Sequence, residues 1–291
     1  MSDRGEPPVA LSIAGSDSGA GAGLQADLKT MGALGVFGTT AVTAVTAQNT
    51  VTVGAVQLLG ADMVRSQIEA VLDDLPVAAV KTGMLGTAEV VEEVGRCAAA
   101  GRLPRLVVDP VMVASTGRLL LADEGIDSYR RALLPHALVA TPNLWEAAIL
   151  AGVEPAALRD VDDMIEVARR LHKLGSQWVL IIGGHLPGVA TQDRHPAPAQ
   201  VSDVLFDGQA VSVLDGSHVD TPTTHGTGCS LSAAIAARLA HGDDVPAAVA
   251  AAKRFVHGAL AGGAGWRLGA GHGPLDHLGW NRNGPDGVGL G

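Results

Sequence analysis

Short apolar runs rich in β-branched residues alternate with helical patterns along most of this chain, and this alternation limits the possible folds more than any other feature. The runs predicted as buried strands cover residues 9–13, 39–46, 77–80, 106–108, 138–140 and 178–182. The predicted helices cover about residues 23–34, 62–73, 88–99, 143–151, 161–174, 228–240 and 246–261. Strands that alternate with helices form βαβ units with parallel strands. We therefore expect an α/β fold with a central, mostly parallel sheet flanked by helices on both faces.

The sequence shows no boundary between domains. Its 291 residues are 47% hydrophobic, which is enough for one large core, and no linker or internal repeat divides them. Residues 201–206 and 210–214 flank Asp207-Gly208, a dipeptide typical of β-hairpin turns. We predict a single domain over residues 1–291, with flexible tails at residues 1–8 and from about residue 281 onward.

Charge and cysteine content narrow the function. The formal net charge of −10 argues against a broad surface for nucleic acid, and no apolar run approaches the length of a membrane span. The first residues lack the pattern of a signal peptide, and the two cysteines, Cys97 and Cys229, fit a reducing compartment. We expect a cytoplasmic protein with no nucleic-acid or membrane partner. Such a protein would hold an anionic ligand with backbone N–H groups and a bound cation.

Two glycine-rich turns could bring backbone N–H groups close to a ligand. The first, residues 15–23, joins a predicted strand to a helix, and a plain tight turn explains it equally well. The second, Thr223-Thr-His-Gly-Thr-Gly-Cys229, opens a helix, so its N–H groups and the helix dipole favour an anion. A Walker A loop would place a lysine after its last glycine, whereas Cys229 follows Gly228 here. This difference argues against a P-loop fold.

Cys229 occupies the first turn of that predicted helix. A helix start lowers the pKa of a thiol and raises its thiolate fraction, so Cys229 could act as a base toward a nearby hydroxyl. The alternative is a small buried hydrophobic residue. For Cys97, inside a helical stretch, we favour packing.

Carboxylates follow two of the predicted strands. Asp109 ends one strand, and Asn143 and Glu146 follow another, one helical turn apart. The carboxyl ends of parallel strands face the ligand crevice of an open α/β sheet, where these groups could hold Mg²⁺ beside phosphate oxygens. A capping box, with Asn143 as N-cap and Glu146 as its partner, explains the second pair equally well.

Taken together, the motifs resemble those of the hydroxymethylpyrimidine/phosphomethylpyrimidine kinases of thiamine biosynthesis, which are ribokinase-like proteins. The matching stretches are residues 14–30, Thr46-Ala-Gln-Asn49, Lys81-Thr-Gly-Met-Leu85, Val108-Asp-Pro-Val-Met-Val113, Thr141-Pro-Asn143 with Glu146, Gly183-Gly-His185 and Thr224-His-Gly-Thr-Gly-Cys-Ser230. They follow the order of the family from about residue 9 to residue 277. An ordered set of this length is far more specific than any single motif.

The resemblance implies ATP-dependent phosphorylation of 4-amino-5-hydroxymethyl-2-methylpyrimidine and of its monophosphate, with Mg²⁺, in a homodimer. It implies that the substrate-binding residues are Gly15, Asp27, Gln48 and Met84, with Asp27 and Gln48 on the polar edge of the ring. In the same way, Cys229 would face the hydroxymethyl group, while Gly226, Thr227 and Gly228 would cradle the phosphoryl group. Asp109 and Glu146 would arrange the metal. The implied ATP-binding residues are Asn143, Gly183, Gly184, Thr223 and Lys253.

The chain departs from the family pattern near the expected phosphate path. Ile182 and Ser115 stand where the family usually carries lysines, and Thr223 stands where asparagine is usual. Arg118 follows Ser115 in the same loop, and a guanidinium can bind phosphate through two donors. We expect Arg118 to make part of the missing phosphate contact; the alternative is an ordinary solvated arginine.

Two other functions stay open from the sequence. One is a pyridoxal kinase of the same fold, since that ring also carries a hydroxymethyl group; Asp27 and Gln48 favour the pyrimidine. The other is a non-catalytic pyrimidine-binding homologue, which the changes at Ile182 and Ser115 suggest. The retained Asp109, Glu146 and complete glycine turn argue against it.

Overall fold

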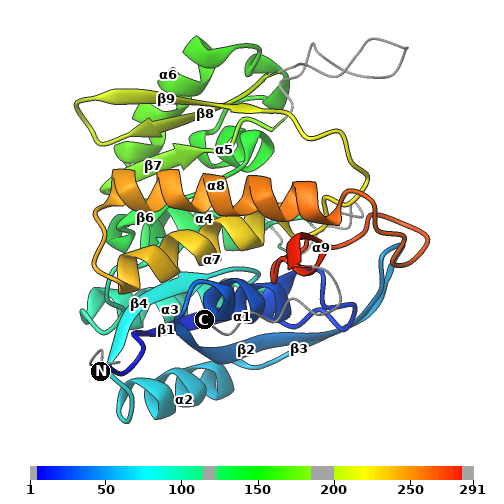
Figure 1. The fold of residues 1–291 in the computed structure, drawn as a ribbon. Coiled ribbons are helices and arrows are strands. Elements are labelled where there is room, and N and C mark those ends of the chain that lie inside the picture. The colour runs from blue at the N-terminus through cyan, green and yellow to red at the C-terminus, as the bar shows by residue number, and fades with distance from the viewer. Residues whose placement is uncertain (1–4, 114–120, 122, 185–199, 284–291) are drawn as a thin grey trace.

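A nine-stranded sheet forms the centre of the computed structural model, which describes residues 5–113, 121, 123–184 and 200–283 (Figure 1). In chain order the strands are β1 (Val9–Gly15), β2 (Phe37–Gln48), β3 (Val53–Leu58), β4 (Val77–Thr82), β5 (Val107–Val108), β6 (Val139–Ala140), β7 (Trp178–Ile181), β8 (Gln200–Phe206) and β9 (Val211–Ser217). Their order across the sheet is β3-β2-β1-β4-β5-β6-β7-β8-β9. Every pair between β2 and β7 is parallel, whereas β3 at one edge and β8 and β9 at the other pair antiparallel. The predicted α/β fold with a mostly parallel sheet is confirmed.

Helices pack on both faces of this sheet. They are α1 (Gly23–Ala33), α2 (Ala61–Leu72), α3 (Ala88–Ala99), α4 (Asp123–Ser128), η1 (Tyr129–Leu133), η2 (Leu134–His136), α5 (Leu144–Ala151), η3 (Pro155–Ala157), α6 (Val161–His172), α7 (Thr227–Ala240), α8 (Val245–Gly263) and α9 (Trp280–Asn283). One apolar core joins the sheet to α2, α3, α5 and α6, and a second core joins the opposite face to α1, α7 and α8. In Figure 1 the helices α7 and α8 lie side by side across the near face of the sheet.

The short strands at the centre of the sheet are buried on both faces. Each residue of β5 and β6 is at most 1% exposed, because a helical layer covers each side. Such strands carry continuous apolar runs instead of an alternating pattern. Their carboxyl ends, with those of β1 and β4, lie at one edge of the sheet, since the strands are parallel. Polar residues that follow these strands are thereby brought together.

The structure differs from the sequence-based prediction in four places. Strand β3 was not predicted, and neither were the helical stretch from α4 to η2 and the short helix η3. The start of the C-terminal tail predicted from about residue 281 overlaps α9, which extends to Asn283, and residues 284–291 lie outside the described residues. The predicted hairpin is confirmed: Gly208 adopts φ +96°, and the Asp207 carboxylate accepts hydrogen bonds from the N–H groups of Gln209 and Ala210. Within the described ranges, no helix is both long and apolar enough to cross a bilayer.

Candidate active site

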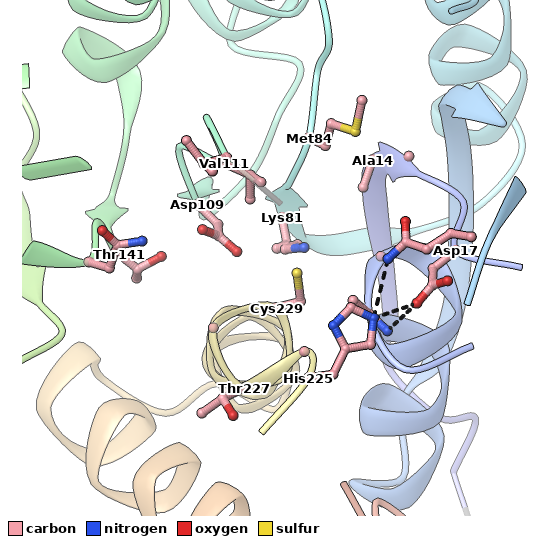
Figure 2. Close-up of a pocket in the computed structure, with 18 of the residues that line it drawn as sticks. Ala14, Asp17, Lys81, Met84, Asp109, Val111, Thr141, His225, Thr227 and Cys229 are labelled. Carbon is pink, nitrogen blue, oxygen red and sulfur yellow. Dashed lines mark hydrogen bonds and ion pairs between the residues drawn. The ribbon is translucent and has the colours of Figure 1, made fainter. Parts of the chain in front are cut away.

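A cavity of about 260 Å³ opens at the carboxyl ends of the central strands. Figure 2 shows side chains from several strand ends and from the start of α7 pointing into it. The predicted site residues on its wall are Gly15, Gln48, Met84, Asp109, Asn143, Glu146, Gly226, Thr227, Gly228 and Cys229. Segments from both ends of the chain therefore meet at one site. Arg118 and Ser115 lie outside the described residues.

The second glycine-rich turn has the geometry of an anion site. Gly226 is the N-cap of α7 and adopts φ +88°, a left-handed conformation that side chains rarely take. A Cβ at Gly226 would lie 2.0 Å from the carbonyl oxygen of Gly21, so only glycine fits between the two turns. The first N–H groups of a helix have no partner within it, and those of α7 border the cavity. This helix start is suited to a phosphoryl group.

Asp17 organises the first glycine-rich turn, a role that the sequence analysis missed. Its carboxylate accepts hydrogen bonds from the N–H groups of Gly19, Gly21 and Ala22 at 2.8–3.1 Å. His225 Nε2 lies 2.9 Å from Asp17 Oδ2, so this carboxylate also joins the two turns. Burial acts to raise the pKa of Asp17, but the hydrogen bonds from His225 and the backbone hold it below its ordinary value. Asp17 is therefore ionised at neutral pH.

Lys81 places a buried positive charge at the base of the cavity. Its ammonium group lies 2.9 and 3.1 Å from the two carboxylate oxygens of Asp27, and neither side chain is exposed. Ser12 donates a hydrogen bond to the same carboxylate at 2.6 Å. Burial alone would lower the pKa of Lys81, but the charge of Asp27 raises it above its ordinary value. The sequence analysis quoted Lys81 in a motif and did not assign it to the site.

Asp27 does not reach the cavity. It is fully buried behind the wall, and its oxygens are occupied by Lys81 and Ser12. The predicted hydrogen bond from Asp27 to the substrate ring therefore stays a prediction. In this structure Asp27 contacts Lys81, which itself borders the cavity.

Cys229 projects from the first turn of α7 toward Lys81, with Asp109 nearby (Figure 2). Burial raises the pKa of its thiol to about 12, although the charge of Lys81 acts in the opposite direction. The prediction that the helix start gives this cysteine a low pKa is therefore wrong. At neutral pH Cys229 carries its proton, and only a trace of thiolate is present. The predicted packing role of the other cysteine, Cys97, agrees with its half-buried position in α3.

Asp109 and Glu146 are two buried carboxyl groups on the cavity wall. Burial raises the pKa of Asp109 to about 6; burial and the nearby charge of Asp109 raise that of Glu146 to about 8. The capping box is also present, because Asn143 and Glu146 exchange side-chain to backbone hydrogen bonds. The capping-box interpretation of Glu146 is confirmed, and its role toward a metal stays a prediction. A cation bound beside these two buried carboxyls would favour their ionised forms.

These carboxyls fit Mg²⁺, which binds through one or two carboxylates together with water and substrate phosphates. In the part of the chain that the structure describes, no cluster of three or more acidic, histidine or cysteine side chains could hold a metal by itself. The metal would complete its coordination with phosphate oxygens. Asp109 is held in place by a 3.0 Å hydrogen bond from Ser232 on α7.

Comparison with known proteins identifies the family. The model of the family described as phosphomethylpyrimidine kinase matches residues 17–276. The chain belongs to this family. The hydroxymethylpyrimidine/phosphomethylpyrimidine kinase of Streptomyces coelicolor is 48% identical over 274 residues, which cover 94% of this chain and 95% of the relative.

Solved structures extend the similarity from sequence to fold. An ADP complex of Bacillus subtilis pyridoxal kinase is 39% identical with a TM-score of 0.83, covering 95% of this chain and all of that one (100%). A phosphomethylpyrimidine kinase from Clostridium difficile is 37% identical with a TM-score of 0.73, covering 86% of this chain and 98% of that one. The ribokinase-like fold and the family predicted from the motifs are both confirmed.

Four of the residues predicted to bind ATP do not line the cavity of this phosphomethylpyrimidine kinase family member. They are Gly183, Gly184, Thr223 and Lys253. Lys253 forms an ion pair with the buried Asp203 and donates to the carbonyl oxygen of Leu214 at 2.7 Å. Asp203 in turn accepts the N–H of Gly183 at 2.8 Å, so Lys253 supports the segment after β7. Ile182, where the resemblance leads us to expect a lysine, lies on the wall. Contact of the four residues with ATP stays a prediction.

The paired carboxyls predict a pH-dependent effect of Mg²⁺ on stability. Because both pKa values are raised on folding, the folded chain holds these protons more tightly than the unfolded chain. Their contribution to stability is present below about pH 4 and is lost as pH rises through about 6 and 8. Added Mg²⁺ should therefore raise the free energy of unfolding more at pH 8 than at pH 5. Urea denaturation with and without Mg²⁺ measures this difference.

The double variant Asp109→Asn, Glu146→Gln should abolish the pH-dependent effect of Mg²⁺. A matched control changes two exposed carboxyls of α6, Asp162→Asn and Glu166→Gln, and should keep it. An equal effect of Mg²⁺ in both double variants would contradict the assigned site.

Proposed function

We propose that this chain transfers the terminal phosphoryl group of ATP to the hydroxymethyl group of 4-amino-5-hydroxymethyl-2-methylpyrimidine. The monophosphate is then phosphorylated in turn, which gives the pyrimidine diphosphate used in thiamine biosynthesis. One observation carries the proposal. A single cavity places an amide and an apolar side chain, Gln48 and Met84, opposite a helix start with the glycine turn at Gly226. The family membership and the name of the Streptomyces coelicolor relative support the same activity.

The ring would bind between Gln48, Met84 and Gly15. A Cβ at Gly15 would lie 3.2 Å from the sulfur of Met84, so glycine leaves the space above the ring open. The Gln48 amide offers a donor and an acceptor, which match the ring nitrogen and the amino group of an aminopyrimidine. The substrate is thus recognised by one polar edge and one apolar face.

Phosphoryl transfer would take place at the start of α7. Its transition state is loose, so positioning and charge stabilisation matter more than a strong base. The N–H groups around Gly228 would hold the transferring group, and Lys81 would offset the charge that develops beside Cys229. Cys229 would hold the hydroxymethyl oxygen in line. That oxygen would form its bond to phosphorus as the bond to ADP breaks, and its proton would pass late to an oxygen of the transferred phosphoryl group. Asp109 and Glu146 would hold Mg²⁺, which supplies charge neutralisation to the phosphates.

A pyridoxal kinase is the second candidate function, since the Bacillus subtilis structure of that name shares the fold at 39% identity. Measuring ADP release with hydroxymethylpyrimidine, its monophosphate and pyridoxal as acceptors separates the two activities. We expect both pyrimidines to be phosphorylated and pyridoxal to be the poorest acceptor. No ADP release with any acceptor would instead favour a non-catalytic binding protein.

Replacing Gln48 with leucine should weaken pyrimidine binding. Leucine fills similar space but leaves the polar edge of the ring without partners, at a cost of about 1–3 kcal/mol. Isothermal titration calorimetry of the pyrimidine without ATP measures the change. Affinity for ADP serves as the control and should stay unchanged. Equal pyrimidine affinity in wild type and variant would contradict the role of Gln48.

The proposal also includes a cellular location and an oligomeric state. A cytoplasmic location fits two free cysteines and a reaction that consumes ATP. A homodimer is proposed from the resemblance alone.

A further inference from the structure

Two neighbours of the Gln48 amide have fixed hydrogen-bond polarity, because each makes a shorter bond elsewhere. Thr46 Oγ1 lies 3.5 Å from Gln48 Oε1 and 2.8 Å from the carbonyl oxygen of Ser16. His225 Nε2 lies 3.3 Å from Gln48 Nε2 and 2.9 Å from Asp17 Oδ2 (Figure 2). In each case the shorter hydrogen bond shows where the hydrogen of the neighbour points: that of Thr46 toward Ser16, and that of His225 toward Asp17.

The hydroxyl of Thr46 has one hydrogen, and the carbonyl oxygen of Ser16 can only accept. Thr46 therefore gives that hydrogen to Ser16 and can only accept from Gln48. Asp17 is an ionised carboxylate, so it too can only accept, and His225 Nε2 must carry a hydrogen to donate to it. This holds for neutral and for protonated His225. A nitrogen that carries its hydrogen cannot accept one from the Gln48 amide.

A half-turn about the last side-chain bond of Gln48 exchanges its oxygen and nitrogen without changing its shape. Only the orientation opposite to the one in those distances avoids two mismatched contacts: the oxygen then faces His225 and shares the hydrogen that His225 gives to Asp17, and the nitrogen faces Thr46 and donates to it. We propose that Asp17 and His225, together with Thr46, lock the Gln48 amide in this orientation and thereby decide which way round the substrate ring binds. This inference rests on the proposed function. His225 is then a positioning residue that sets specificity through Gln48.

The locked orientation agrees with the chemistry of the proposed substrate. The 4-amino group donates to the Gln48 oxygen on the His225 side, and the adjacent ring nitrogen accepts from the Gln48 nitrogen on the Thr46 side. The hydroxymethyl group is on the ring carbon next to the amino group, on the side away from that nitrogen. The hydroxymethyl group therefore lies on the His225 side of the ring. His225 directly precedes Gly226, so this side of the cavity also carries the second glycine-rich turn and Cys229. With the opposite amide orientation the hydroxymethyl group would face away from that turn.

The test uses a probe with the reversed polar edge, 5-hydroxymethyl-2-methylpyrimidin-4-one. Its ring nitrogen donates and its 4-oxo group accepts, so it fits only the amide orientation that the lock forbids. By calorimetry without ATP, wild type should bind the 4-amino compound at least about a hundredfold more tightly than the 4-oxo compound. The variant His225→Leu frees the amide to turn, and the ratio of the two affinities should fall at least about tenfold. General damage to the site would weaken both compounds together and leave the ratio unchanged.

The control is His257→Leu, at an exposed histidine of α8, which should keep the wild-type ratio. A second variant, Thr46→Val, removes the other half of the lock with almost no change in shape and should also lower the ratio. Thr46→Val decides the question if His225→Leu fails to fold. Equal binding of the two compounds by wild type, or an unchanged ratio in the folded variants, would overturn the lock. If wild type binds ADP but neither pyrimidine, the proposed function itself fails.

Discussion

Replacing Lys81 with methionine should destabilise the fold by about 3–5 kcal/mol, the usual cost of removing one partner from a buried ion pair. Methionine matches the length of lysine but leaves the carboxylate of Asp27 buried with Ser12 as its remaining side-chain partner. Turnover should fall by roughly a hundredfold or more, because the charge at the base of the cavity is lost. Denaturant unfolding and steady-state ADP release measure the two effects separately.

The double variant Lys81→Met, Asp27→Asn separates stability from catalysis. Asparagine removes the unpaired charge, so much of the stability should return while turnover stays low. Lys173→Met, at an exposed lysine at the end of α6, controls for the loss of a lysine and should match wild type in both assays. Wild-type turnover in a folded Lys81→Met protein would show that this charge does not act on the reaction.

Cys229→Ala should lower turnover by about a hundredfold and leave pyrimidine affinity nearly unchanged. The thiol is protonated at neutral pH, so its contribution is to position the hydroxymethyl oxygen and to accept its hydrogen bond. Serine can make the same contacts, and Cys229→Ser should therefore keep most of the activity that alanine loses. Turnover measured from pH 6 to 10 should show no rise centred near pH 9, the ordinary pKa of a free thiol.

Cys97→Ala is the matched control for the cysteine prediction. Cys97 is the other cysteine of the chain, and it packs in α3, away from the cavity wall. Its replacement should leave turnover unchanged. A rate in Cys229→Ala equal to that of Cys97→Ala would contradict the positioning role. A rise in turnover near pH 9 would instead indicate catalysis by the thiolate.

The sequence predicts the central part of the fold because buried strands and amphipathic helices leave strong patterns. The continuous apolar runs of β4, β5, β6 and β7 were predicted to within about two residues of their observed bounds. Strand β3 escaped because only its first residue is buried, so it lacks the apolar face that a periodicity search detects. The stretch from α4 to η2 escaped because π and 3₁₀ turns interrupt its helical period.

The residues of the site also divide into those that a local sequence pattern predicts and those that depend on contacts between distant segments. Local patterns predicted Gly226, because glycines just before a helix are a recognisable sequence signal. The capping box of Asn143 and Glu146 was predicted in the same way, from the three-residue spacing of its two members. Contacts between distant segments were not predictable from spacing. The Lys81–Asp27 pair joins β4 to α1, and the Asp17–His225 pair joins two loops. The pKa of Cys229 also depends on burial, which the position at a helix start does not reveal.

The close approach of Gly21 to Gly226 affects how the protein is made as well as how it works. The first turn leaves the ribosome early, but its partner comes near the end of synthesis, and loop closure over such a distance is slow. Until then one face of β1 and β4 also lacks the cover that α7 and α8 provide. A nascent chain therefore exposes an apolar face that invites aggregation for most of its translation. The second glycine-rich turn and the second core are completed together, so the candidate active site forms in the same late step that covers this apolar face.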